Sequence, residues 1–525
     1  MPIKLHDFQQ EVVNKFFKSG SLLCVLPTGT GKTVVALEII RRLKEQYGNK
    51  TKCLIVVPAN LRSNFVDTIR KFQLKLNAEI IQKVSQLDQA YRTKTILVIS
   101  YDFMRLYALK LLRYKWTLIV ADEVHYAKNR QTKNFAVLYQ LRLNSRHFLG
   151  LTASPIANTP EEFFTILIIV TGDRSIFAEG MQLIKYMEIG RKDPTWWEKL
   201  KATLTGRRPR SKKGELIPIG IKDIEAFRRL VGRWVYIPHY SKIEKLGTRP
   251  KVKSFVVRVD LDDFETKAYK YALRKIPRQD LKDLKEGTIT NARLRQIKNI
   301  IMACQQTLLS PDYIYEYEER GQEGVEQSNI SLFRPGSKIK AVAKFLKQTG
   351  EKTIVFSSFL RFGARLANHY FNKLGIKSRE YSGAVKPQER KEIIKQFEEG
   401  DLQVICLTGA GQEGMNLPSC KNVFFLNLPW HGEILRQVVG RALRITSKNP
   451  FVRMFWLFAY TKDGQETIDL WLSNLIKRKD IIRNAIFAAL QETTANVSVQ
   501  LPSYEGPRPK SKRKPDTVLG INYPR

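Results

Sequence analysis

The sequence contains few cysteines, and they are not grouped as metal ligands are. There are five in 525 residues, with no C-x-x-C pair and no histidine at ligand spacing: Cys24, Cys53, Cys304, Cys406 and Cys420. Cys24, Cys53 and Cys406 lie in apolar runs that are typical of buried strands. The pattern therefore predicts cysteines packed in a core, with neither zinc nor disulfides.

Long apolar runs are also missing. No run approaches the ~20 uninterrupted apolar residues that a membrane-spanning helix requires, and residues 1–10 lack the apolar core of a secretory signal. We therefore expect an unsecreted, intracellular protein that does not bind a membrane. Its length and its 43% hydrophobic content leave room for two large domains with packed cores.

Acidic residues are scarce relative to basic ones. The chain has 50 Asp and Glu against 89 Lys and Arg, which gives a formal net charge of +39. So large an excess repels itself unless a polyanion neutralises it, and it favours nucleic acid as the partner. A basic surface that serves only solubility is the alternative, and a phospholipid membrane is favoured less than either.

Short apolar runs alternate with longer helical patterns in two parts of the chain. This rhythm predicts an α/β fold in which helices wind around parallel sheets. The expected strands lie at 22–26, 53–57, 96–99, 117–121 and 147–151 in the first part, and at 353–357, 377–381, 403–407, 423–426 and 452–458 in the second.

The domain boundaries are placed where this rhythm fails. We predict a first α/β lobe at 1–172, a basic and helical insertion at 173–250, a second lobe at 251–495 with a helical insert at about 262–330, and a tail at 496–525. The tail is basic and too poor in apolar residues to fold, so we expect it to be disordered. It suits either a nuclear-import signal or an arm that binds nucleic acid without sequence preference. We expect the protein in the nucleus if the tail is an import signal and the chain is eukaryotic, and otherwise in the cytoplasm, the nucleoid or a virion.

A glycine-rich segment follows the first expected strand and precedes a helical pattern. Glycines at such a point let backbone N–H groups face phosphates at a helix N-terminus. Lys32 is predicted to reach the β- and γ-phosphates of ATP, and the Thr33 hydroxyl to bind Mg²⁺. An accidental strand-to-helix turn is the alternative. The residues of this loop that we expect to bind ATP are Thr28, Gly29, Thr30, Gly31, Lys32 and Thr33.

Adjacent carboxylates follow the expected strand at 117–121. Asp122 can hold the Mg²⁺ shell, and Glu123 can polarise the water that attacks the γ-phosphate. The start of a helix is the alternative for such a pair. The glycine-rich segment upstream favours the catalytic interpretation.

Arg441 and Arg444 lie three positions apart, on one face of an expected helix in the second lobe. Such a face can present an arginine to the γ-phosphate, and an arginine supplied in this way contributes ~10³–10⁵ in rate. A surface helix that pairs with acidic neighbours is the alternative.

The ordered motifs resemble those of helicase superfamily two, and within it the Swi/Snf-like group. The resemblance implies two RecA-like lobes in tandem, ATP and Mg²⁺ as cofactors, and nucleic acid as the partner, with duplex DNA favoured over single strands or RNA. It extends over about residues 5–458 with a gap at the insertion, and its segments include Leu5-His6-Asp7-Phe8-Gln9, Asp122-Glu123-Val124-His125, Thr152-Ala153-Ser154-Pro155, Gly411-Gln412-Glu413-Gly414 and Pro429-Trp430.

Further residue roles are implied by the same resemblance. Gln9 is expected to read adenine, and Gly414 and Gln437 to bind the nucleotide from the second lobe. The residues expected to couple the ATP site to the nucleic acid are His125, Thr152 and Ser154. Those expected to contact nucleic acid are Pro58, Ser100, Tyr101, Ser357, Thr408 and Trp430.

The motif set predicts an ATP-dependent motor that moves along duplex DNA. A strand-separating DNA or RNA helicase is the alternative, because Pro27 to Thr30 and Gly440 carry variants that are common among strand-separating members. A non-catalytic scaffold that binds nucleic acid is a third interpretation. It is disfavoured because the residues that hydrolysis needs are intact: Lys32, Asp122, Glu123, Arg441 and Arg444.

Overall fold

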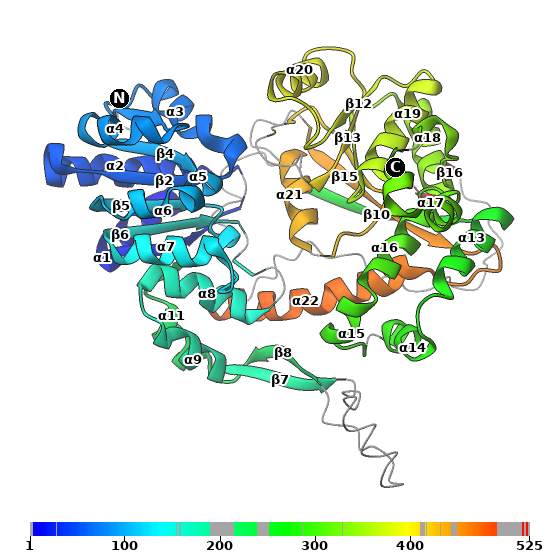
Figure 1. Ribbon diagram of the computed structural model, residues 1–525, viewed down its shortest axis with the longest axis horizontal. Coiled ribbons are helices and arrows are strands. Elements are labelled where there is room, and N and C mark those ends of the chain that lie inside the picture. The colour runs from blue at the N-terminus through cyan, green and yellow to red at the C-terminus, as the bar shows by residue number, and fades with distance from the viewer. Residues whose placement is uncertain are drawn as a thin grey trace, which may run out of the picture. The chain divides into compact units, whose positions relative to one another are not determined.

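The expected strands assemble into two separate parallel sheets. The computed structural model describes residues 4–27, 29–153, 155–156, 159–189, 215–238, 251–286, 288–327, 329–409, 415, 417–430, 432–442, 449–490, 517–518 and 521–522. The chain divides into two units, each with its own sheet (Figure 1). The first unit comprises Met1–Lys185, Pro218–Thr248 and Lys479–Ser498, and the second comprises Tyr186–Ile217, Arg249–Arg478 and Val499–Arg525.

The sheet of the first unit has seven strands in the order β3-β4-β2-β5-β6-β1-β9, and its pairings are parallel. Strands β1, β2 and β4 are buried on both faces, which is why they read as continuous apolar runs in the sequence. The bounds are β1 Ser21–Val25, β2 Cys53–Val57, β3 Ala78–Ile80, β4 Ile96–Ser100, β5 Trp116–Asp122, β6 Ser145–Thr152 and β9 Val235–Tyr236.

Helices pack on this sheet (Figure 1). Every second strand residue, such as Cys24, Ile55 and Val98, points into one core, where it meets the apolar sides of α1, α2 and α3. The bounds are α1 Asp7–Ser19, α2 Lys32–Tyr47, α3 Arg62–Lys71, α4 Leu87–Thr93, α5 Tyr101–Leu106, α6 Ala108–Leu111, α7 Lys133–Leu143, α8 Pro160–Thr171, α9 Ser175–Gln182 and α11 Ile224–Val231.

The expected insertion adds a strand to the first sheet. Strand β9 pairs with β1 in parallel, although it lies in the stretch at 173–250 where the α/β rhythm fails. A strand of two residues is too short to show a period in the sequence, so the pattern could not reveal it. The same stretch forms a separate two-stranded sheet from β7 (Ile184–Ile189) and β8 (Glu215–Ile221).

The sheet of the second unit has six strands in the order β10-β15-β14-β11-β13-β12, all paired in parallel. The strand bounds are β10 Lys251–Asp260, β11 Thr353–Phe356, β12 Ser378–Tyr381, β13 Val404–Leu407, β14 Asn422–Phe425 and β15 Phe451–Tyr460. The helix bounds are α13 Asp263–Leu273, α14 Arg278–Glu286, α15 Asn291–Gln296, α16 Lys298–Thr307, α17 Tyr313–Gln327, α18 Ser337–Thr349, α19 Leu366–Lys373, α20 Pro387–Glu398, α21 Gly432–Ala442 and α22 Ile468–Leu490. Near the C-terminus, β16 Thr517–Val518 and β17 Ile521–Asn522 form a short antiparallel pair.

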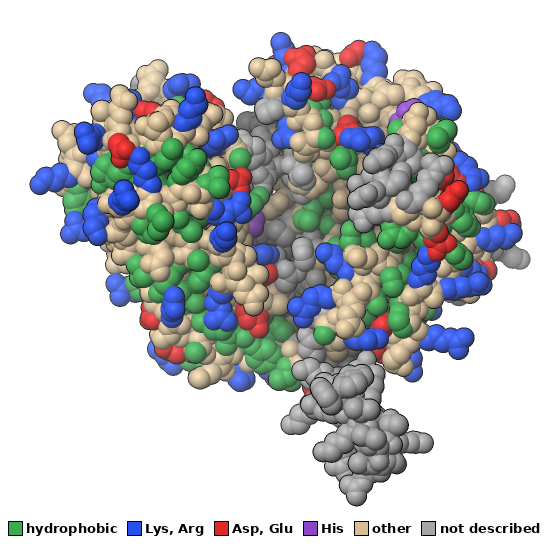
Figure 2. All heavy atoms as spheres, in the orientation of Figure 1, with side chains coloured by type: hydrophobic (Ala, Val, Ile, Leu, Met, Phe, Trp, Pro, Cys, Tyr) green, Lys and Arg blue, Asp and Glu red, His purple; other side chains and the backbone are tan. Residues whose placement is uncertain are grey.

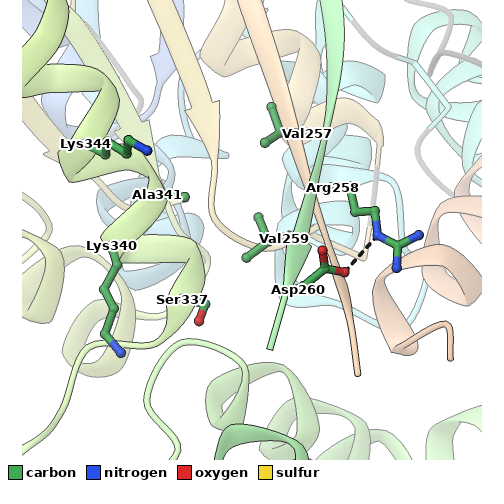
Figure 3. A pocket seen from close by; sticks show the side chains of 8 residues that line it. All are labelled: Val257, Arg258, Val259, Asp260, Ser337, Lys340, Ala341 and Lys344. Carbon is green, nitrogen blue, oxygen red and sulfur yellow. Dashed lines mark hydrogen bonds and ion pairs between the residues drawn. The ribbon is translucent and has the colours of Figure 1, made fainter. Parts of the chain in front are cut away.

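Strand β10 lies at the edge of this sheet beside α18. Figure 3 shows Val257 and Val259 on the side of β10 that faces Ala341 of α18. Arg258 and Asp260 point to the opposite side, where they form an ion pair with Nε of Arg258 2.8 Å from Oδ1 of Asp260. This alternation follows from the two-residue period of a strand, and it leaves a shallow groove between β10 and α18.

A buried ion pair joins two helices of the second unit. Nζ of Lys338, near the start of α18, lies 2.6 Å from Oδ2 of Asp469, near the start of α22, and the two side chains are 0% and 1% exposed. The Lys338 ammonium also donates to the carbonyl of Leu426 at 3.0 Å. Each charge therefore has a partner in the core, which a buried charge requires.

The observed topology confirms the α/β prediction of two parallel-sheet lobes in tandem. All five cysteines are buried in the two units. Within the described residues, no helix has the length and apolar character needed to cross a membrane. Figure 2 shows Lys and Arg side chains spread over the visible face of each unit, with fewer acidic side chains between them.

Candidate active site

The glycine-rich loop and the acidic motif lie at one edge of the first sheet. Strands β5, β6 and β1 are neighbours in that order, and the loop follows β1, Asp122 ends β5 and Thr152 ends β6. Because parallel strands end on the same side, the three segments meet at the carboxyl edge of the sheet. Ligands of open α/β sheets bind at this edge.

The glycine-rich loop is shaped as a phosphate-binding turn. Gly29 and Gly31 have φ angles of 77° and 87°, and Gly31 stands directly before α2, which begins at Lys32. The Thr30 side chain is buried and donates from Oγ1 to the carbonyl of Pro27 at 2.7 Å, which closes the turn. The N-terminus of α2, with its unpaired N–H groups and positive dipole end, is thereby available to an anion.

Gln9 connects α1 to this loop. Its Nε2 donates to the carbonyl of Thr30 at 2.9 Å, and its Oε1 accepts the N–H of His6 at 3.0 Å. A Cβ on Gly31 would lie 2.4 Å from that same Nε2, so a larger residue would clash there. The expected reading of adenine stays a prediction; these two bonds use one of the two N–H donors and one of the two oxygen lone pairs of the amide.

A chain of polar contacts connects the loop to the end of β6. The Lys32 ammonium lies 3.3 Å from Oε1 of Glu123, and Oε2 of Glu123 lies 3.2 Å from Nδ1 of His125. The same His125 nitrogen lies 3.3 Å from Oγ1 of Thr152, which is fully buried. Two of the residues expected to couple the site, His125 and Thr152, are thus brought together, whereas the third, Ser154, lies outside the described residues.

The two carboxylates differ in their electrostatic surroundings. Burial and the neighbouring Glu123 raise the pKa of Asp122 to about 7. Burial would also raise the pKa of Glu123, but Lys32 and His125 prevail and hold that pKa below its ordinary value. Glu123 is therefore the ionised member of the pair, as a group that polarises water must be.

Oxygen donors for Mg²⁺ are present at the site. Thr33 is the second residue of α2, and the Asp122 carboxylate is 7% exposed at the end of β5. A hydroxyl and a carboxylate are among the ligands that Mg²⁺ takes, and the raised pKa of Asp122 reflects a buried carboxylate that nearby cations do not fully compensate. The donor set therefore fits this ion.

The residues expected to contact nucleic acid from the first unit are buried. Pro58 follows β2, Ser100 ends β4 and Tyr101 begins α5. The Ser100 hydroxyl accepts the N–H of Phe103 at 3.1 Å and so caps α5. The Tyr101 hydroxyl donates to the carbonyl of Asp122 at 3.0 Å. Contact between these side chains and nucleic acid stays a prediction, and their burial does not support it.

The corresponding residues of the second unit also face its interior. Ser357 and Thr408 are buried, and Trp430 is half-buried against the core. The Ser357 hydroxyl donates to Oδ1 of Asn427 at 2.9 Å and accepts the N–H of Phe359 at 3.1 Å. The pairing with Asn427 was not expected, because one asparagine after a strand carries no pattern in a single sequence.

The expected nucleotide contacts of the second unit are described only in part. Gln437 lies in α21 and is half-buried, and Arg441 lies in the same helix with its side chain outside the described part. Three other expected site residues lie outside the described residues: Thr28 of the glycine-rich loop, and Gly414 and Arg444 of the second lobe.

Two family models match the chain. The SNF2-related domain matches residues 17–313, which is more than half of the chain. The helicase conserved C-terminal domain matches residues 337–446. Together they cover most of both units.

Individual relatives are similar over nearly the whole chain. Protein CHROMATIN REMODELING 5 of Arabidopsis thaliana is 22% identical over 492 residues, which are 88% of this chain and 26% of that protein. Nucleoside triphosphatase I of Heliothis armigera entomopoxvirus is 23% identical over 533 residues, 93% of this chain and 78% of that protein. A solved structure, the Sulfolobus solfataricus SWI2/SNF2 ATPase core in complex with dsDNA, is 17% identical, with 94% of this chain and 98% of that chain covered and a TM-score of 0.39. The chain thus spans about a quarter of the length of the plant relative.

Proposed function

The chain belongs to the SNF2-related family, and from this membership and its active-site geometry we propose that it is an ATP-dependent motor that moves along double-stranded DNA. The observation that carries the proposal is the ion pair between Lys32 and Glu123 at 3.3 Å, beside the phosphate-binding turn. It supports the proposal because a cation suited to bind phosphates and a carboxylate suited to activate water lie close enough together to act on one γ-phosphate.

The residues of the first unit divide the work of hydrolysis. The N-terminus of α2 and the Lys32 ammonium bind the β- and γ-phosphates of ATP, which draws Lys32 away from Glu123. Glu123 is then free to accept a proton from the attacking water. Thr33 and Asp122 would hold Mg²⁺, which would supply positive charge to the phosphates. Arg441 and Arg444 are proposed to stabilise the charge that develops on the phosphates.

Hydrolysis is coupled to movement through the end of β6. His125 contacts both the Glu123 carboxylate and the Thr152 hydroxyl, at 3.2 and 3.3 Å. When ATP binds or is hydrolysed, Glu123 changes its contact with Lys32. The His125 imidazole, which contacts both Glu123 and Thr152, can transmit this change to the end of β6. Repeated binding and release would move the motor along its track.

Double-stranded DNA is the proposed track. The family membership and the net charge of +39 support a polyanionic partner that is gripped by its phosphates. The plant relative is named for chromatin remodelling, and duplex DNA as the substrate of this chain is part of the proposal.

A strand-separating helicase is the second candidate, and the motif variants at Pro27 to Thr30 and at Gly440 favour it. The two candidates differ in what they do to a duplex. A translocase displaces the third strand of a triplex without opening a forked duplex, whereas a helicase opens the fork.

The test of the proposed function is steady-state ATP hydrolysis with no nucleic acid, single-stranded DNA, duplex DNA and RNA. Preferential stimulation by duplex DNA that Lys32→Ala abolishes is the expected result. Preference for a single strand or for RNA would select the helicase. If the wild-type chain hydrolysed no ATP under any of these conditions, the motor would be rejected in favour of a scaffold.

A further inference from the structure

The side chain of Tyr101 reaches across the sheet edge to the acidic motif. Tyr101 begins α5 directly after β4, and its hydroxyl lies 3.0 Å from the carbonyl oxygen of Asp122 and 3.4 Å from that of Glu123. Strands β4 and β5 are not neighbours, because β2 lies between them. The side chain therefore spans the end of β2, and it is only 4% exposed.

The turn that Tyr101 contacts has an unusual backbone. Glu123 has φ 50° and ψ 52°, in the left-handed region that non-glycine residues seldom adopt. Such a conformation costs free energy and persists where the surroundings hold it. Because the direction of a side chain follows from its backbone angles, a change in this turn would redirect the Glu123 carboxylate.

Tyr101 contacts the turn at both of its ends. The hydroxyl binds the carbonyls at the start of the turn, and the ring stacks on Tyr126 at its end, with centroids 5.2 Å apart and planes at 17°. The Glu123 carbonyl also accepts the N–H of Tyr126 at 3.0 Å, which closes the turn. Burial raises the pKa of Tyr101 well above its ordinary value, and the negative charges of Asp122 and Glu123 raise it further. The hydroxyl therefore keeps its proton and acts as a donor.

We propose that Tyr101 is a positioning residue for ATP hydrolysis, which fixes the direction of the Glu123 carboxylate. It does so by holding the turn at both ends, through the carbonyls of Asp122 and Glu123 and through the ring of Tyr126. The assignment rests on the proposed function, since it concerns the group that activates water. It is an alternative to the contact with nucleic acid that the family resemblance implied for this residue, and the two roles differ in what a substitution would change.

The test removes only the hydroxyl, by Tyr101→Phe in the full chain, and keeps the ring that stacks on Tyr126. We expect kcat for ATP hydrolysis at saturating duplex DNA to fall about 10- to 100-fold, the effect of a small misplacement of a reacting group. The KM for ATP and the affinity for duplex DNA should not change. The matched control is Tyr139→Phe, because Tyr139 is also buried in the first unit and its hydroxyl donates to the carbonyl of Gly172 at 3.2 Å.

The other outcomes would overturn the assignment in separate ways. If the wild-type chain is active and Tyr101→Phe has the same kcat, the hydroxyl does not position Glu123. Weaker DNA binding with unchanged kcat at saturation would show a nucleic-acid contact. Equal losses in Tyr101→Phe and Tyr139→Phe would show a general effect on stability. An inactive wild-type chain would reject the proposed function itself, and this assignment with it.

Discussion

Lys32 and Glu123 form an ion pair across the candidate active site, with Nζ 3.3 Å from Oε1 and side chains 12% and 16% exposed. Each of these groups is expected to act on ATP, and each neutralises the other before ATP arrives. The phosphates of ATP must therefore replace the Glu123 carboxylate as the partner of Lys32, and this exchange leaves the carboxylate free to polarise water.

The first prediction separates binding from chemistry at this pair. Glu123→Gln should lower kcat by about 10²–10⁴, the usual contribution of a positioned base, while ATP affinity is retained because Lys32 is released. Lys32→Ala should weaken ATP binding itself. Steady-state phosphate release and equilibrium binding of ATP measure the two effects. Glu45→Gln, at an exposed glutamate of α2, is the control. Turnover near the wild-type value in Glu123→Gln would exclude Glu123 as the activating base.

The second prediction concerns Gly31, whose φ of 87° and proximity to Gln9 leave no room for a side chain. Gly31→Ala should raise the KM for ATP, because a Cβ there lies 2.4 Å from Nε2 of Gln9, so that either the Gln9 amide, which bonds the loop, or the loop itself must move. Gly350→Ala is the matched control, since Gly350 also has left-handed backbone angles, with φ 63° and ψ 7°, but nothing lies within 4 Å of its added Cβ. The control should cost only about 1–2 kcal/mol of stability, the strain of a left-handed residue. Equal KM values in the two variants would count against a role for the loop in binding ATP.

The third prediction concerns the buried pair between Lys338 and Asp469. Lys338→Met should destabilise the second unit by about 3–5 kcal/mol, because it leaves the Asp469 charge buried without its partner. The double variant Lys338→Met, Asp469→Leu should recover much of this loss. Thermal unfolding measures both. The control is Lys377→Met, at a pair with Asp401 whose side chains are 64% and 76% exposed, where solvent screens the charges and little or no change in stability is expected. No recovery in the double variant would show that the pair contributes more than charge compensation.

The fourth prediction is a loss of stability in mild acid at His147. Burial lowers its pKa from 6.5, Nδ1–H donates to the carbonyl of Gly20 at 2.8 Å, and Nε2 has no described acceptor. The unfolded chain thus binds a proton at His147 more tightly than the folded chain does. The contribution of the neutral His147 side chain to stability is therefore complete above pH 6.5, and it is lost as the pH falls from 6.5 through the lowered pKa. The slope cannot exceed about 1.4 kcal/mol per pH unit for one proton.

Thermal unfolding above and below pH 6.5 tests this prediction. His147→Asn should lose less stability on acidification than the wild-type chain does. The control is His369→Asn, which changes a histidine of the second unit. An identical pH dependence in wild type and His147→Asn would show that other groups account for any acid sensitivity.

The fifth prediction concerns the salt dependence of DNA binding. If the basic surface grips phosphates, the logarithm of the association constant should fall linearly with the logarithm of the salt concentration, with a slope of about −0.9 per phosphate contacted. Fluorescence anisotropy with a labelled duplex at several salt concentrations measures the slope. A flat response would reject binding that is dominated by the phosphate backbone.

Much of the active site could be predicted because its residues follow short, regular patterns. The loop that leads to Lys32 follows β1, and Asp122 ends β5. Because the carboxyl ends of parallel strands meet at one edge, local pattern and topology agree. The directions of the side chains of Tyr101 and Ser357 could not be predicted in the same way. Each depends on a partner far along the chain, Asp122 and Asn427 respectively, and no local period encodes such a contact.

The pairing of β10 with β15 has a consequence for how the second unit is made. Lys251 is in register with Phe451, 200 positions later, and β15 is the only strand beside β10 in its sheet within the described chain. At ~5–20 residues per second, a ribosome takes roughly 10–40 s to produce the partner of β10. During that interval β10 has no strand to pair with, so the nascent chain offers an unpaired strand to chaperones or to a neighbouring copy. Completion of the second sheet is therefore a late event in synthesis.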